Sequence, residues 1–82
     1  MKMKYNVKIA KKQEKEIKIT TEFIRLDAAL KLSNAVTTGG AAKMIIQDEL
    51  VKVNGEICVS RGKKLRNGDC FEYEHIIYKI VL

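Results

Sequence analysis

The fold is decided by one stretch of sequence, Val51-Lys52-Val53-Asn54-Gly55-Glu56-Ile57-Cys58-Val59. Apolar residues alternate with other residues on both sides of Asn54-Gly55. That dipeptide between two alternating runs is the strongest short-range signal for a β-hairpin, because a type I′ turn needs positive φ at both central positions. A second tight turn at residues 66–69 leads into further alternation from Phe71 to Leu82. The second half of the chain therefore predicts antiparallel strands.

Two short helices are predicted before this hairpin. Apolar residues with helical spacing between Leu26 and Leu32 indicate the first one. The break Thr37-Thr38-Gly39-Gly40 precedes the second helix, which we expect from Ala41 to about Glu49. Thr38 is a suitable N-cap, since its hydroxyl can accept a hydrogen bond from a free amide of the first turn.

The N-terminal part predicts further strands. Residues 5–9 and 17–19 alternate between apolar and polar types, which indicates two short strands joined by a hairpin loop at residues 11–15. We expect residues 1–15 to be a basic N-terminal extension, with a strand as its candidate structure, and residues 16–82 to be a single domain. The order of elements predicts an α+β fold in which two short helices pack on a small, mainly antiparallel sheet.

The charge of the chain points to an anionic partner. Its 82 residues carry a formal net charge of +6, and the sequence pI is about 9.5. Nucleic acid is the first class of partner that such an excess suggests, and a membrane surface is the second. Residues 1–18 hold seven Lys against two Glu, a pattern typical of a solvated terminus. Residues 51–70 hold five Lys and Arg against two acids within a segment rich in turns, which favours a basic surface.

Composition argues against several other classes. The sequence has no apolar run of the roughly 18 residues that a membrane span needs, and no signal-peptide pattern follows its basic start. Cys58, Cys70 and His75 are too few and too widely spaced for a tetrahedral zinc site, so we expect two reduced thiols in a cytoplasmic protein without metal or cofactor. His75 has no evident nucleophile or orienting partner, so we expect no enzymatic activity.

Several short motifs, taken in their order and spacing, resemble the α-L RNA-binding motif, the domain first named for ribosomal small-subunit protein four. The motifs are Arg25-Leu26-Asp27, Leu30-Lys31, Ala42-Lys43, Val53-Asn54-Gly55 and Gly68-Asp69. Residues 38–43 and 61–65 are most similar to small stand-alone bacterial members of the YaaA and YbcJ type. The resemblance covers about residues 16–72, and Thr38 replaces the usual Ser while keeping the hydroxyl.

The candidate binding residues follow from chemistry and from this resemblance together. A helix that begins after Gly-Gly presents free N–H groups and a partial positive charge to phosphate oxygens, without side chains in the way. Lys43 in the first turn, Lys52 on a strand and the basic loop at residues 61–64 would line one groove. Arg25 has two open interpretations, a phosphate contact or a carboxylate partner. The predicted RNA-binding residues are Arg25, Lys31, Thr38, Gly39, Gly40, Lys43, Lys52, Asn54, Arg61, Lys63, Lys64 and Arg66.

The resemblance implies a non-enzymatic protein that binds structured RNA, with ribosomal RNA as the expected ligand. Its expected partners are the ribosome or ribosome-assembly intermediates, and we expect a monomer that does not bind membranes. Two alternatives belong to other classes. One is a protein-interaction domain whose basic surface meets an acidic protein. The other is a β-grasp sulfur carrier, although such carriers need a C-terminal Gly-Gly and this chain ends in Ile80-Val81-Leu82.

Overall fold

The computed structural model describes residues 12–82. Along this part of the chain, two strands come first, two short helices follow, and five further strands complete it. The elements are β1 (Gln13–Lys18), β2 (Ile24–Arg25), α1 (Leu26–Leu32), α2 (Gly39–Gln47), β3 (Lys52–Val53), β4 (Glu56–Ile57), β5 (Lys64–Leu65), β6 (Cys70–Tyr73) and β7 (Ile76–Val81). Neither helix of this part is long and apolar enough to cross a membrane.

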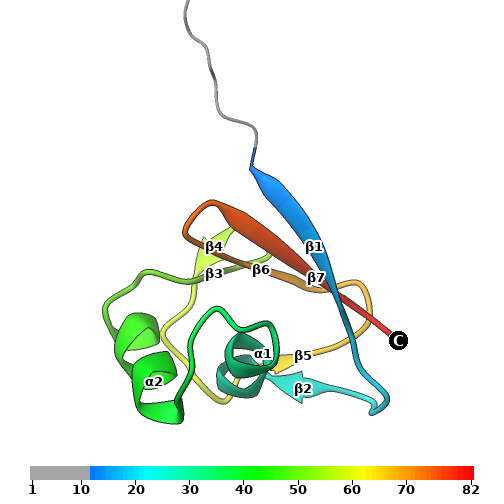
Figure 1. Ribbon diagram of the computed structural model, residues 1–82, viewed down its shortest axis with the longest axis horizontal. Helices are drawn as coiled ribbons and strands as arrows, with labels where there is room; N and C mark the ends of the chain where they lie inside the picture. Colours follow the sequence, from blue (N-terminus) through cyan, green and yellow to red (C-terminus); the bar gives the residue numbers. More distant parts are fainter. Residues whose placement is uncertain (1–11) are drawn as a thin grey trace, which may run out of the picture.

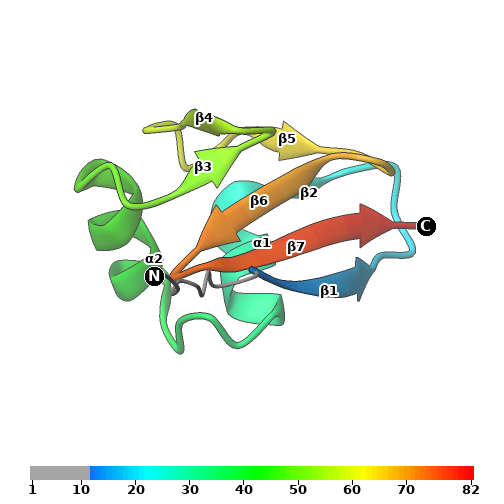
Figure 2. The same cartoon turned by 90° about the horizontal axis from the view of Figure 1, so that it is seen from above.

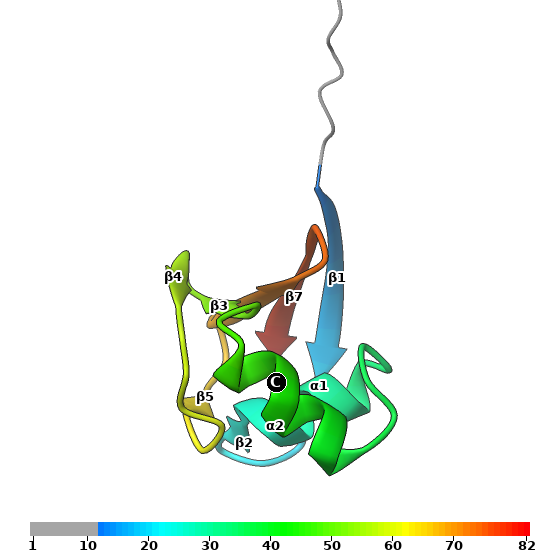
Figure 3. The same ribbon diagram turned by 90° about the vertical axis from the view of Figure 1, so that its left-hand side faces the viewer.

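The strands form one five-stranded sheet and one short ribbon. The sheet has the order β1-β7-β6-β3-β4, and Figure 2 shows these strands side by side. All neighbouring strands are antiparallel except β1, which is parallel to β7. The helices lie under one face of the sheet, and the antiparallel β2–β5 ribbon lies beside α1 (Figures 1 and 3). The predicted α+β class with a mainly antiparallel sheet is confirmed.

The hairpin predicted at Asn54-Gly55 is confirmed, with φ of 51° at Asn54 and 89° at Gly55. Its apolar pattern, however, does not continue into the core after the turn. Val53 lies opposite Glu56 and Lys52 lies opposite Ile57. Residues opposite each other point to the same side of a sheet, so Ile57 faces away from the core with Lys52. The side chain of Ile57 is accordingly 54% exposed, whereas Val53 is 7% exposed.

The second helix begins two residues earlier than the sequence predicts. Gly39 and Gly40 form its first two positions, and it ends at Gln47 rather than near Glu49. The predicted cap is confirmed, because the N–H of Ala41 donates to Oγ1 of Thr38 at 3.0 Å. Because Thr38 is the N-cap residue, the two residues that follow it, Gly39 and Gly40, are the first two residues of the helix.

The N-terminal expectation is partly wrong. Residues 13–15 are not a hairpin loop but belong to β1, where Gln13 lies opposite Ile76 in parallel register. The free edge of β7 supplies the partner for this strand, which a local pattern could not reveal. β1 crosses the predicted boundary between the extension and the domain at residue 15, and the strand expected at residues 5–9 lies outside the described residues.

The core joins the helices to the sheet. The stacked rings of Phe71 and Tyr78 form its centre, with centroids 4.7 Å apart. The buried apolar residues are Ile19, Leu26, Ala29, Leu30, Ala42, Ile46, Val51, Val53, Leu65, Phe71, Tyr78 and Ile80. Since both helices and the sheet face above them contribute to this cluster, removal of its contacts would release both helices together.

The side chain of Asn54 connects two turns that are distant in sequence. Its Oδ1 accepts from the N–H of Cys70 at 3.0 Å, and its Nδ2 donates to Oδ1 of Asp69 at 3.3 Å. The other carboxylate oxygen of Asp69 accepts from the N–H of Arg66 at 2.8 Å. The Val-Asn-Gly and Gly-Asp motifs therefore hold the β3–β4 turn against the start of β6.

We predict that Asn54→Gly destabilises the protein by about 1–2 kcal/mol, because glycine keeps the positive φ while both side-chain hydrogen bonds are lost. The thermal midpoint should fall by about 4–8 °C for each kcal/mol lost. Asn34→Gly is the matched control. Asn34 also has positive φ, 62°, and its side chain makes no hydrogen bond within residues 12–82. Equal melting curves for the two variants would contradict the structural role of Asn54.

Candidate nucleic-acid interface

The N-terminus of α2 has unused hydrogen-bond donors. Ala42 donates to the carbonyl of Thr38 at 3.1 Å, and Ala41 donates to the Thr38 hydroxyl. The N–H groups of Gly39 and Gly40 have no acceptor within residues 12–82. These two amides, at the positive end of the helix dipole, can bind an anion.

The fold itself does not require glycine at these two positions. A Cβ added to Gly39 would meet no atom within 4 Å, and one added to Gly40 would meet only Oγ1 of Thr38, at 4.0 Å. Neither glycine has positive φ. Glycine in a helix costs up to about 1 kcal/mol of stability relative to alanine, so two glycines that the fold does not require indicate another role. The missing Cβ atoms leave space for a ligand to approach this backbone closely.

The N-terminus of α1, in contrast, is closed by the protein. The N–H of Leu26 donates to the carbonyl of Lys63 at 2.8 Å, and the N–H of Asp27 donates to the carbonyl of Arg61 at 3.1 Å. The N–H of Ala28 donates to Oδ1 of Asp27 at 2.8 Å. These bonds leave α1 without free amides in its first turn, but they hold the basic loop at residues 61–64 against it.

A shallow hollow of about 270 Å³ joins the two helices. Its lining includes Arg25, Lys31 and Gly39, together with Asp27 and Ala28. The structure therefore brings together three of the predicted binding residues. Lys43 follows Gly39 by four residues, which places it one turn further on the same side of α2.

The β2–β5 ribbon adds cations next to this hollow. Arg25 lies opposite Lys64, while their neighbours Ile24 and Leu65 pack toward the core. The Arg25 guanidinium donates from Nη2 to Oδ2 of Asp27 at 3.1 Å, so Arg25 has a carboxylate partner although its side chain is 53% exposed. We call the resulting area the basic surface. It comprises Arg25, Lys31, Gly39, Gly40, Lys43, Arg61, Lys64 and Arg66.

Three predicted binding residues lie elsewhere. Lys52 points to the outer face of the sheet, opposite Glu72, because its neighbours Val51 and Val53 point to the helices. The sheet separates it from Lys43, so these two lysines do not line one groove in this structure. Lys63 lines a hollow beside the β3–β4 hairpin, and both polar ends of the Asn54 amide are used within the fold.

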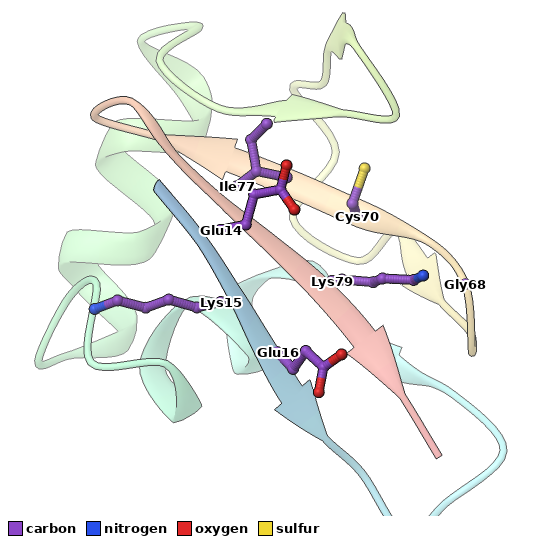
Figure 4. Close-up of a pocket in the computed structure, with 7 residues that line it drawn as sticks. All are labelled: Glu14, Lys15, Glu16, Gly68, Cys70, Ile77 and Lys79. Carbon is purple, nitrogen blue, oxygen red and sulfur yellow. The ribbon is translucent and has the colours of Figure 1, made fainter. Parts of the chain in front are cut away.

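The outer face of the sheet carries charges of both signs. Its largest hollow, of about 530 Å³, lies over β1, β7 and β6 (Figure 4). There Glu16 lies opposite Lys79, and the Glu14 carboxylate projects on the same side of the sheet. Nearby, Nζ of Lys12 lies 2.9 Å from Oε2 of Glu72. This mixture makes the outer face a poor binding surface for a polyanion.

Most cations of the basic surface have no carboxylate partner within residues 12–82. Within residues 12–82, the ion pairs are Lys12–Glu72 and Arg25–Asp27. Five exposed cations of the basic surface form no ion pair in this part of the chain, namely Lys31, Lys43, Arg61, Lys64 and Arg66. Their positive charge is therefore available to a ligand.

Other reactive groups form no evident site. Burial, followed by the charge of Glu74, raises the pKa of Tyr73, and the same two causes raise the pKa of Tyr78. Both tyrosines belong to the core or pack against it. Cys58 and Cys70 are free thiols. The described residues contain no group of three His, Cys, Asp or Glu side chains placed to hold a metal ion.

Comparison with known proteins agrees with the fold described above. The S4 domain family matches residues 17–81, which include both helices and every strand described above except the first four residues of β1. The chain is also 43% identical over 58 residues to the probable ribosome maturation protein RlbA of Bacillus subtilis (strain 168), an alignment that covers 71% of this chain and 82% of that protein. With the family matched over most of its length, the chain belongs to the S4 domain family.

Proposed function

We propose that this chain is a non-enzymatic, cytoplasmic RNA-binding protein whose basic surface binds structured RNA, with ribosomal RNA as its ligand. One observation carries the proposal. The two unused amides of Gly39 and Gly40 lie beside cations that have no carboxylate partner in residues 12–82. Free helix amides with nearby lysines and arginines fit the phosphate groups of a nucleic-acid backbone.

The amides and the cations have different tasks in this proposal. One phosphate binds at the N-terminus of α2, where missing Cβ atoms allow its oxygens to reach the amides of Gly39 and Gly40. Lys43, one turn further along the same side of α2, adds a charge-assisted contact. Arg25 and Lys31 bind a neighbouring phosphate from the other side of the hollow. Backbone contacts of this kind recognise the shape of folded RNA more than its base sequence.

The family and the relative support the biological setting. The motif that the sequence resembles is an RNA-binding domain, and the name of the B. subtilis relative refers to ribosome maturation. We therefore propose the ribosome or its assembly intermediates as partners of a monomeric protein.

We predict that Lys43→Glu combined with Lys64→Glu abolishes measurable RNA binding while the thermal midpoint hardly moves, since both side chains are exposed. The matched control is Lys52→Glu combined with Lys79→Glu, which changes the net charge equally on the outer face of the sheet. The control should lose far less affinity. Fluorescence anisotropy with a ribosomal RNA fragment measures both variants, and equal losses would contradict the basic surface.

The salt dependence of the same binding curves counts the phosphates involved. If about four or five phosphates are neutralised, the logarithm of affinity should fall with the logarithm of salt concentration at a slope of about −3 to −4. An RNA affinity that does not change with salt concentration would refute phosphate binding. In a separate capture experiment, an acidic protein that stays bound after nuclease treatment would favour the protein-interaction alternative.

We predict that Gly39→Ala has opposite effects on stability and on binding. Alanine should stabilise the protein by up to about 1 kcal/mol, because it favours the helix and meets no neighbouring atom. The added methyl group should keep a phosphate from the amides and lower RNA affinity about tenfold, the value of one hydrogen bond to a charged group. Met44→Ala, on another side of α2, is the control for binding. A stabilised Gly39→Ala protein with unchanged affinity would refute the phosphate site.

A further inference from the structure

Phe23 is an aromatic residue that the core does not use. It lies directly before β2, where Oγ1 of Thr21 donates to the carbonyl of Phe23 at 2.8 Å. Phe71 is fully buried and Tyr73 packs against the core. Phe23 is only partly buried, and it belongs neither to the core nor to the apolar residues packed against it. Its ring is thus available on the surface.

The register of the β2–β5 ribbon places this ring among cations. Ile24 lies opposite Leu65 and Arg25 lies opposite Lys64, so the next pair in this antiparallel register is Phe23 and Arg66. Since Ile24 and Leu65 point toward the core, the side chains that alternate with them point outward. The outward face of the ribbon therefore carries one aromatic ring and three cations.

Two of these cations lie over the ring itself. Nζ of Lys64 is 4.9 Å from the ring centroid of Phe23, and the guanidinium carbon of Arg66 is 5.7 Å from it. Both cations belong to exposed side chains that form no ion pair within residues 12–82. An exposed cation–π contact is weak, so a ligand can displace these flexible chains from the ring at low cost.

We propose that Phe23 stacks on an unpaired base of the bound RNA, while Lys64 and Arg66 bind the phosphates on either side of that base. This inference rests on the proposed function and specifies the class of RNA. A nucleobase stacks on an aromatic ring more strongly than an exposed cation binds to it, so the base takes the ring face and releases the cations to phosphate. Bases inside a regular duplex are already stacked and cannot reach the ring.

The RNA recognised by this protein therefore has two adjacent parts. A structured part binds through its phosphates to the hollow between α1 and α2, where Lys31 and Gly39 lie. An unpaired nucleotide from a loop, bulge or end lies against the ribbon. Arg25 belongs to both areas, because it lines the hollow and lies opposite Lys64 in the ribbon.

The test compares wild-type protein with Phe23→Leu on two RNA probes, a blunt RNA duplex and the same duplex with a short unpaired adenosine tail. Leucine keeps an apolar side chain but offers no ring. We expect Phe23→Leu to bind the tailed duplex about 5- to 100-fold more weakly, the usual range for one lost base–aromatic stack, and the blunt duplex as wild type does. Equal affinities of the two proteins for the tailed duplex, or equal losses on both probes, would overturn the stacking role.

A direct readout is available because the chain contains no tryptophan. In Phe23→Trp, the indole is the single strongly fluorescent group, and the tailed duplex should quench it while the blunt duplex should not. An indole that responds equally to both probes would also overturn the stacking role. Failure of wild-type protein to bind either duplex at low salt would refute the proposed function as a whole, whereas binding of both probes without any effect of Phe23 would refute this inference alone.

Discussion

The two backbone hydrogen bonds between the first turn of α1 and the loop at residues 61–63 are the contacts on which the rest of the surface depends. Leu26 and Asp27 donate to the carbonyls of Lys63 and Arg61, and so α1 needs no side-chain cap at Arg25. The same bonds place β5 beside β2 and bury Leu65 beneath the ribbon. These contacts satisfy the backbone amides at the start of α1. The start of α2 has no such contacts within residues 12–82, and its first two amides stay free.

The parts of this structure that sequence could predict are those set by local chemistry. Positive φ at Asn54 and Gly55 and the hydroxyl cap of Thr38 depend on residues within a few positions of each other, and the structure has both. The prediction was wrong in two details, the residue at which α2 begins and the side of the hairpin to which Ile57 points. The second could have been avoided, because a two-residue turn pairs Val53 with Glu56 and so reverses the apolar alternation.

The parts that sequence could not predict depend on distant partners. β1 is highly charged and joins the sheet only because β7 offers a free edge. The β6–β7 turn has positive φ at Glu74 and His75, a pair that lacks the Asn-Gly or Asp-Gly signal of such turns. Of the candidate site, the glycines and Lys43 could be found from helix chemistry. The separation of Lys52 and the exposure of Phe23 could not, since each depends on which face of a strand meets the core.

The net charge of +6 becomes informative only after these placements are known. On the outer face of the sheet, Lys12 pairs with Glu72 and Lys79 lies opposite Glu16, so the cations there share the surface with carboxylates. On the helix side, Lys43 and Lys64 have no carboxylate partner in the described part of the chain. The backbone amides at Gly39 are fixed by the helix, whereas these long side chains can move. A ligand would therefore be positioned by the amides and then held by cations that adjust to its shape.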